Sequence, residues 1–423
     1  MLGALVLAGA LLRLWHFLTR GNLWNDEAGL ALNFVGRTFS EVARPWISAQ
    51  IAPYLFVQSE KVVSLVLGES DFALRLLSLV AGIAVLPLTA AVVQRMAGTR
   101  AALLSLILLV PAHRLIHFTA ELKPYALDAC VAALLLWLGQ RAARSTRDLH
   151  VLGVVGVVAG WFSLPSLFML AGVGAALAAD ALLREKNRAR LVVLGGYGVF
   201  WLASFGLHFK LFLQPVATDS NMHQYYAALD DYAPFPPRSL GDLKWYIGRF
   251  FFLFKAPGGY ALRYLAGVLW VVGAIDAFRK QRWLALMFVV PWVAVFGASA
   301  VHHYILEERV LVFLVPCMTV LIALGVDDLL ERPFPALRAL GLLLMVAILV
   351  APLRSVGEHF RLRREGPGLA DLVERMKREA GPSDGIYIDR ATLRCFTFYS
   401  GRLGFEHPYA TAAADSLDES EHR

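Results

Sequence analysis

The sequence predicts an all-α protein that crosses a membrane many times, with about eleven transmembrane helices, a long first outer loop and a small α/β tail. Hydrophobic residues make up 58% of the 423 residues. That share becomes about 63% when Gly is counted and Tyr is not, against 45–50% in soluble domains. Charged residues are only 17%, and runs of about 20 apolar residues recur along the chain. These features exclude a disordered chain and a cytosolic enzyme.

Eleven segments are apolar enough to cross the bilayer as helices. They are Leu2–Leu18, Phe72–Val93, Ala101–Phe118, Tyr125–Leu138, Val151–Phe162, Leu164–Leu183, Leu191–Leu213, Ala261–Phe278, Trp283–Ala300, Tyr304–Val326 and Ala336–Leu353. Around Pro165 we count two helices, because one helix would be much too long for the bilayer. The first segment is interpreted as a retained span and not a signal peptide, since it lacks a basic leading region and carries Arg13.

The charged residues predict the orientation of these spans. Lys and Arg total 40 against 33 Asp and Glu, and the cations cluster between apolar runs, which indicates orientation in a bilayer and not nucleic-acid binding. With the N-terminus in the cytoplasm, every loop predicted to lie inside is short and basic. The basic residues of these loops are Arg95, Arg100, Arg141, Arg144, Arg147, Arg184, Lys186, Arg188, Arg190, Arg279, Lys280, Arg282, Arg332 and Arg338. We therefore expect an integral, multi-pass protein of the plasma (inner) membrane.

This orientation divides the chain into two predicted domains. Residues 1–353 form the membrane domain, whose long outer loops are 19–71 and 214–260. Residues 354–423 form a small C-terminal domain on the extracytoplasmic face, because long terminal segments are translocated largely regardless of charge.

Short segments outside the spans also have predictable structure. In the C-terminal domain the pattern predicts a helix near Gly368–Ala380, a strand at Ile386–Asp389 and a helix after it. Ala49–Gly68 is apolar but carries Glu60 and Lys61, which is typical of a helix that lies on the membrane surface. The three cysteines show neither disulfide nor metal-binding spacing.

The first outer loop carries adjacent carboxylates, Asp26 and Glu27, just beyond the end of the first span. A carboxylate at the membrane surface can act as a general base on an acceptor hydroxyl, or bind a metal ion. The alternative is a helix start, in which the pair caps a surface helix at Ala28–Val35. For the dipeptide alone the helix start is favoured.

The second outer loop carries Glu121 and Lys123 at the mouth of the third and fourth spans, with Asp128 one turn into the fourth. A Lys here suits a phosphate as a point charge, whereas the alternative is a solvated hairpin whose Lys reaches lipid headgroups. An ionisable residue such as Asp128 within a span is a functional candidate by default.

Cations also occur within the outer half of the spans. Arg13 and Arg75 either bind phosphate or form buried ion pairs with Asp26, Glu27 or Asp128, and both alternatives stay open. A further polar cluster lies at the outer end of the tenth span, consisting of His302, His303, Glu307, Glu308 and Arg309. Adjacent histidines are poorly spaced for a metal on a helix, so we favour an interfacial polar belt there.

The outer loop at 214–260 is long, and loops of this length are usually functional. Its segment Tyr225–Tyr232 combines tyrosines with Asp230 and Asp231, a composition that suits sugar recognition by stacking and hydrogen bonding. Aromatic residues at the membrane interface are the alternative for Trp245 and Tyr246.

Four motifs in this order resemble those of the membrane-integral GT-C glycosyltransferases, in the branch of dolichyl-phosphate-mannose protein mannosyltransferases and bacterial lipopolysaccharide-core transferases. The motifs are an Arg in the first span followed by Leu23–Ala28, then Ala52–Phe56 with Glu60–Lys61, then Gly68–Ser78, and then Ala120–Asp128. The resemblance covers roughly residues 2–183.

The resemblance implies an enzyme that takes a sugar from a polyprenyl-phosphate carrier at the outer face of the membrane. The acceptor would be an extracytoplasmic glycan, lipid or protein. Asp26 would be the catalytic base, Glu27 would orient it or the acceptor, and Lys123 and Arg75 would face the donor phosphate. The other predicted substrate-binding residues are Glu121, Tyr125, Asp128 and Arg13. No cofactor is indicated, and a divalent metal ion stays an open alternative.

Two other classes compete with the enzyme. A transporter or flippase of lipid-linked saccharides tends to show repeated halves and ionisable residues at the membrane midplane, whereas the polar residues here gather at one face. In a non-catalytic membrane scaffold, Asp26 and Glu27 would be only a helix cap.

Overall fold

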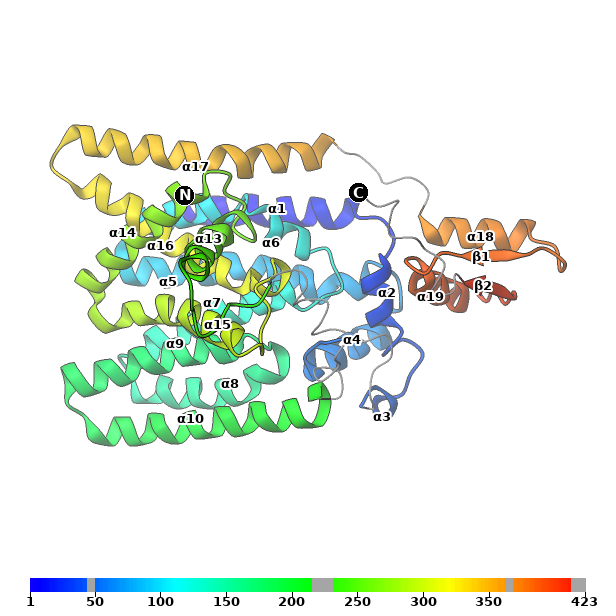
Figure 1. Cartoon of the computed structure of the whole chain (residues 1–423), viewed down its shortest axis with the longest axis horizontal. Helices are drawn as coiled ribbons and strands as arrows, with labels where there is room; N and C mark the ends of the chain where they lie inside the picture. Colours follow the sequence, from blue (N-terminus) through cyan, green and yellow to red (C-terminus); the bar gives the residue numbers. More distant parts are fainter. Residues whose placement is uncertain (44–49, 215–230, 362–367, 412–423) are drawn as a thin grey trace.

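The computed structural model describes residues 1–43, 50–214, 231–361 and 368–411. In Figure 1 most helices run side by side as one bundle, and smaller elements gather beyond one end of it. The helices of the bundle are α1 (Leu2–Thr19), α5 (Leu76–Leu109), α7 (Tyr125–Ala142), α8 (Thr146–Phe162), α9 (Ser166–Ala179), α10 (Arg188–His208), α14 (Arg263–Gln281), α15 (Leu286–Ala300), α16 (Val315–Glu331) and α17 (Pro335–Arg361). The all-α membrane architecture predicted from the sequence is confirmed.

Seven helical segments of the described chain are long and apolar enough to cross a membrane. Two of them, Ala73–Leu109 and Arg263–Ala300, each hold two predicted spans. The backbone breaks inside them at Gly98 and Arg282, which have φ angles of 85° and 48°. A positive φ suits Gly, which has no Cβ to clash. α7 and α8 are also predicted spans but lie outside this set, so the count of eleven stays a prediction.

Some span boundaries differ from those predicted. The third span, Ala101–Phe118, is not one helix: α5 ends at Leu109 and the short helix α6 covers His113–Phe118. The tenth, Tyr304–Val326, begins later, as the 3₁₀ turn η5 (Arg309–Leu314) that leads into α16. The helix of the last predicted span, α17, continues past Leu353 to Arg361. The predicted break near Pro165 is confirmed by the gap between α8 and α9.

The core of the bundle is built around α16, which is almost entirely buried. Its Gly325 lies directly against Gly273 of α14: a Cβ on Gly273 would lie 1.8 Å from the Leu321 carbonyl oxygen. Such small-residue contacts let two membrane helices approach closely. In contrast α1, α10 and α17 expose most of their apolar side chains, as helices that face lipid do.

Beyond one end of the bundle lie the smaller elements, and we call this the loop-rich end. They are α2 (Asn25–Ala31), α3 (Phe39–Val42), α4 (Tyr54–Leu67), α18 (Leu369–Glu379), β1 (Ile386–Ile388), α19 (Leu393–Leu403) and β2 (Tyr409–Thr411). β1 and β2 pair in parallel, with Ile386 opposite Tyr409. The predicted helix, strand and helix of the tail are thus present, and β2 is additional. In the other outer loop, α13 covers Leu240–Lys255.

The opposite end, which we call the turn end, brings together the loops predicted to share the cytoplasmic side. The Gln281 amide donates to the Met96 carbonyl at 2.7 Å, and Lys280 Nζ lies 2.6 Å from Glu331 Oε2. Arg190 donates to the Ala142 carbonyl. These contacts agree with the predicted sorting of loops by side. Which end faces the cytoplasm stays a prediction.

Candidate functional site

The helix α2 carries the two predicted catalytic carboxylates at the loop-rich end. It begins at Asn25, three residues before the predicted start at Ala28. The Glu27 Oε2 atom accepts a hydrogen bond of 3.1 Å from the Trp24 backbone N–H. A Glu at this position commonly bonds back to the residue that begins the helix, so the helix-start alternative is right for Glu27. It leaves the Asp26 carboxylate available for other contacts.

Glu27 is fully buried and its oxygens are all used. Arg75 donates to it through Nε at 2.8 Å and a terminal nitrogen at 2.7 Å, and the Leu122 backbone N–H donates at 2.7 Å. Arg75 also donates to the Gly21 and Asn22 carbonyls at 2.7 and 2.9 Å. Of the two alternatives open for Arg75, the structure therefore supports the buried ion pair, with Glu27 as the partner. This pair ties α2 to the start of α5 and to the loop before α7.

Asp26 is the more accessible carboxylate, with 20% of its side chain exposed. Its Oδ2 atom lies 3.0 Å from Lys123 Nζ and 3.4 Å from a guanidinium nitrogen of Arg309, and Gln50 donates to Oδ1 at 3.2 Å. Burial by itself would raise the pKa of Asp26. The charge and hydrogen bond of Lys123, the hydrogen bond of Gln50 and the charge of Arg309 outweigh it and hold this pKa below its usual value.

Lys123 contacts both Asp26 and Gln50 at this site. Its ammonium donates to the Gln50 side-chain oxygen at 2.7 Å and contacts Asp26. Burial lowers the pKa of Lys123, and the Asp26 carboxylate only partly restores it. Glu121 belongs to a neighbouring group, since its carboxylate lies 3.0 Å from Arg20 and 2.7 Å from His117. The structure therefore brings Lys123 to Asp26, and pairs Glu121 with other residues.

Arg309 and Gln50 complete the cluster, and sequence reasoning did not assign either to it. Arg309 pairs with Glu307 at 2.7 Å and with Asp26 at 3.4 Å, whereas the sequence favoured an interfacial polar belt at residues 302–309, which stays a prediction. The sequence feature that could have indicated Arg309 was its position as a cation at the mouth of a predicted span. Gln50 carried no signal, because an isolated Gln in a loop has no characteristic spacing. Lys123, Arg309 and Gln50 together surround one carboxylate.

The remaining predicted site residues lie elsewhere. Arg13 is fully buried in α1 and donates to the carbonyls of Leu109 at 3.3 Å and Val110 at 3.4 Å, where α5 ends. This supports a structural role for Arg13. Tyr125 begins α7 with its ring 4.9 Å from that of Phe118.

Asp128 is buried in α7, and its Oδ1 atom has no hydrogen-bond partner among the described residues. Its position within the helix bundle keeps it a functional candidate, as the sequence predicts.

The helix α4 contains a buried acid that the sequence placed only on a surface helix. Both oxygens of Glu60 are buried with no hydrogen-bond partner within the described residues, and burial raises the pKa of Glu60 well above its usual value. The next residue, Lys61, is also buried. Burial without a partner disfavours the charged form of a carboxyl group.

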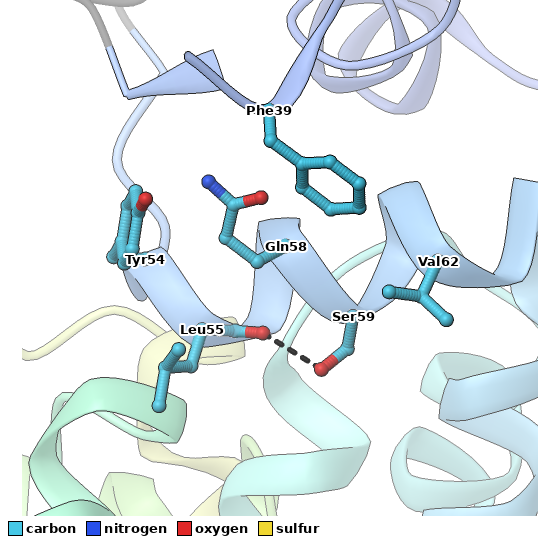
Figure 2. Close-up of a pocket in the computed structure, with 6 residues that line it drawn as sticks. All are labelled: Phe39, Tyr54, Leu55, Gln58, Ser59 and Val62. Carbon is cyan, nitrogen blue, oxygen red and sulfur yellow. Dashed lines mark hydrogen bonds between the residues drawn. The ribbon is translucent and has the colours of Figure 1, made fainter. Parts of the chain in front are cut away.

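The face of α4 beside Glu60 borders a pocket of about 330 Å³. It is lined by Phe39, Tyr54, Leu55, Gln58, Ser59 and Val62. Figure 2 shows the Gln58 amide between the rings of Tyr54 and Phe39, and the Ser59 hydroxyl donating to the Leu55 carbonyl. The pocket is therefore mostly apolar with one amide at its centre.

The proposed sugar-recognition segment Tyr225–Tyr232 falls mainly on residues 215–230, which lie outside the described residues. Within the described part, Asp231 pairs with Arg249 at 3.3 Å, and the Tyr232 ring lies 4.9 Å from that of His302. The described residues contain no group of three or more His, Cys, Asp or Glu side chains placed to hold a metal ion.

Comparison with known proteins identifies the fold. No family model matches the sequence, and no curated protein matches it. Solved structures do match. ArnT from Cupriavidus metallidurans bound to undecaprenyl phosphate is similar over 97% of this chain and 86% of that one, with a TM-score of 0.58 and 16% identity.

The Archaeoglobus fulgidus oligosaccharyltransferase tethered to an acceptor peptide is similar over 94% of this chain and 63% of that one, with a TM-score of 0.53 and 12% identity. The archaeal oligosaccharyltransferase AglB, solved with an inhibitory peptide and a dolichol-phosphate, is similar over the same shares, with a TM-score of 0.54 and 10% identity. The chain therefore has the GT-C fold that the sequence motifs predict. The particular branch of that class stays a prediction.

Proposed function

We propose that this protein is an integral membrane glycosyltransferase that moves a sugar from a polyprenyl-phosphate donor to an extracytoplasmic acceptor, with Asp26 as general base. The observation that carries the proposal is one partly exposed carboxylate held between two cations, Lys123 and Arg309, at the mouth of the helix bundle. A lipid-linked donor places its phosphate at the membrane surface and its sugar in water. The GT-C fold, and the carriers present in the ArnT and AglB structures, support this donor class.

The chemistry divides between the carboxylate and the cations. Asp26 accepts the proton of an acceptor hydroxyl while that oxygen forms a bond to the anomeric carbon of the sugar. The bond from this carbon to the phosphate oxygen breaks, and polyprenyl phosphate leaves with additional negative charge. Lys123 and Arg309 are the cations that would stabilise that charge. Attack opposite to the leaving group inverts the anomeric configuration.

Donor binding also adjusts the strength of the base. Without donor, Lys123 and Arg309 hold the pKa of Asp26 below its usual value. A phosphate that attracts both cations removes much of this effect, while the burial that raises the pKa remains. Asp26 then becomes a stronger base when its substrate is in place, which suits general-base catalysis near neutral pH.

The other residues of the site have supporting roles in this proposal. Glu27 and Arg75 fix the position of α2, and Asp128 and Tyr125 line the bundle side of the substrate region. The active site and the C-terminal domain lie on the extracytoplasmic face of the plasma (inner) membrane, as the distribution of basic loops predicts.

The test is the Asp26→Asn variant in purified protein with a polyprenyl-phosphate sugar. We expect transfer to fall by about 10²- to 10⁴-fold, the usual contribution of a general base, while binding of polyprenyl phosphate is retained. The matched control is Asp328→Asn, whose carboxylate pairs with Arg332 at the turn end and which we expect to leave transfer unchanged.

Full transfer by Asp26→Asn would contradict the assignment of the base. A wild-type protein that moves lipid-linked saccharide across vesicles without forming a glycosidic bond would favour the transporter instead. Against a transporter, the Asp26 cluster lies at helix ends rather than at the membrane midplane, where such sites usually are.

A further inference from the structure

The C-terminal domain packs directly on the helix that carries Asp26. Figure 1 shows α19 beside α2 at the loop-rich end. The two share one apolar core, in which Leu23, Ala28 and Leu30 meet Phe396 and Tyr399. At Gly29 an added Cβ would lie 2.9 Å from Arg394 Cδ, so a side chain there would require Arg394 to shift. The position of α2 thus depends on the C-terminal domain.

At the centre of this contact is the hydroxyl of Tyr399, whose side chain is fully buried. It accepts a hydrogen bond of 2.7 Å from the Leu23 backbone N–H and donates one of 2.9 Å to Asp71 Oδ2. Burial and the Asp71 charge raise the pKa of Tyr399 well above its usual value. The hydroxyl therefore stays protonated and keeps donating to Asp71 at any working pH.

Residues 21–23, just before α2, are also held by side chains near the start of α5. Asp71 Oδ2 also accepts from the Asn22 amide at 3.1 Å, and Asp71 Oδ1 pairs with Arg402 of α19 at 2.7 Å. Arg75 binds the Gly21 and Asn22 carbonyls while it pairs with Glu27. The residues just before α2 are thus fixed between the start of α5 and the C-terminal domain. Asp26 follows Leu23 by less than one helical turn, so a shift of Leu23 is passed to the carboxylate.

We propose that Tyr399 is a positioning residue, whose hydroxyl sets the place of α2 and thereby aligns Asp26 with the reacting atoms. This inference rests on the proposed glycosyltransferase function. Because a misplacement of about 1 Å can cost about 10²-fold in rate, the hydroxyl affects turnover more than substrate binding. Tyr399 itself touches neither Lys123 nor Asp26 in the contacts of the described residues.

The test compares Tyr399→Phe, which removes only the hydroxyl, with the matched control Tyr387→Phe on the exposed face of β1. We expect Tyr399→Phe to lower kcat by about tenfold or more and to change the donor KM less than twofold. Tyr387→Phe should change neither. Asp71→Asn keeps an oxygen that accepts from Tyr399, so it should retain more activity than Asp71→Ala.

A second measurement does not depend on activity. Hydrogen exchange followed by mass spectrometry should show faster exchange across residues 21–31 in Tyr399→Phe, and unchanged exchange in α10. Unchanged exchange at 21–31, or faster exchange with wild-type kcat, would overturn the positioning role. If the variant exchanges faster but the wild-type protein transfers no sugar, the proposed function is overturned. The structural role of Tyr399 in holding α2 would then still stand.

Discussion

Two glutamates at opposite ends of the bundle form ion pairs that differ in their exposure to water. At the loop-rich end, Glu27 and Arg75 are 0% and 1% exposed, and backbone N–H groups complete the shell of Glu27. At the turn end, Glu331 is 44% exposed and bridges Arg100 at 3.0 Å and Lys280 at 2.6 Å. Water screens the second group and not the first. The fully buried ion pair thus lies at the end that holds the candidate site.

The loop-rich end also separates two neighbouring carboxylates by role. Glu27 has every oxygen occupied by donors that belong to the scaffold. Asp26 is held by Lys123, Gln50 and Arg309, which are the groups that a phosphate can attract. A general base has to exchange its partners during a reaction, whereas a structural carboxylate keeps them.

The largest effect that we expect is from Glu27→Gln, which leaves Arg75 as a buried cation without its charged partner. Breaking one side of a buried pair costs about 3–5 kcal/mol. A strongly lowered melting temperature in detergent would show this. The double variant Glu27→Gln with Arg75→Met removes the stranded charge and should recover part of the loss. A single variant as stable as wild type would break the contrast between the two ends.

A second, intermediate effect concerns the pH dependence of transfer. In the free protein the lowered pKa of Asp26 keeps it charged, so kcat/KM falls only at pH values below the usual range for a carboxylate. Lys123→Met removes the main cation that lowers this pKa, while burial still raises it. The acid limb of kcat/KM, which reports the free enzyme, should then move to higher pH in the residual activity. An unmoved or lower limb would contradict the coupling of Lys123 to Asp26.

The smallest effect is expected from Glu331→Gln at the turn end. Its partners are exposed, and exposed ion pairs contribute at most about 1 kcal/mol. The melting temperature should change little, and the small difference from wild type should shrink as salt is added. A loss as large as that of Glu27→Gln would show that the two ends are energetically alike.

Much of the molecule follows from the sequence, because apolar length and charge are local properties of a chain in a bilayer. The break near Pro165 and the helix–strand–helix order of the tail are confirmed, and the contacts at the turn end agree with the predicted sorting of the basic loops. The interruption of the third span after Leu109 was missed, although Pro111 is a local helix-breaking signal. The contact of Arg13 of α1 with the carbonyls at the end of α5 could not be predicted, since it joins distant segments. The late start of the tenth span places Arg309 at the first residue of η5, where its guanidinium lies 3.4 Å from Asp26.

The sequence by itself determined the membrane class and the GT-C fold, and it predicted a site at Asp26 and Glu27, since these depend on composition and on short motifs. Only the tertiary structure decided that Glu27 is fully buried while Asp26 stays partly exposed. It decided that Arg75 pairs with Glu27, and that Asp26 contacts Lys123, Arg309 and Gln50. It also brought the Tyr399 hydroxyl of α19 to the Leu23 backbone N–H just before α2. The physical reason is that pairing and burial depend on distances between segments far apart in the chain, which no local pattern encodes.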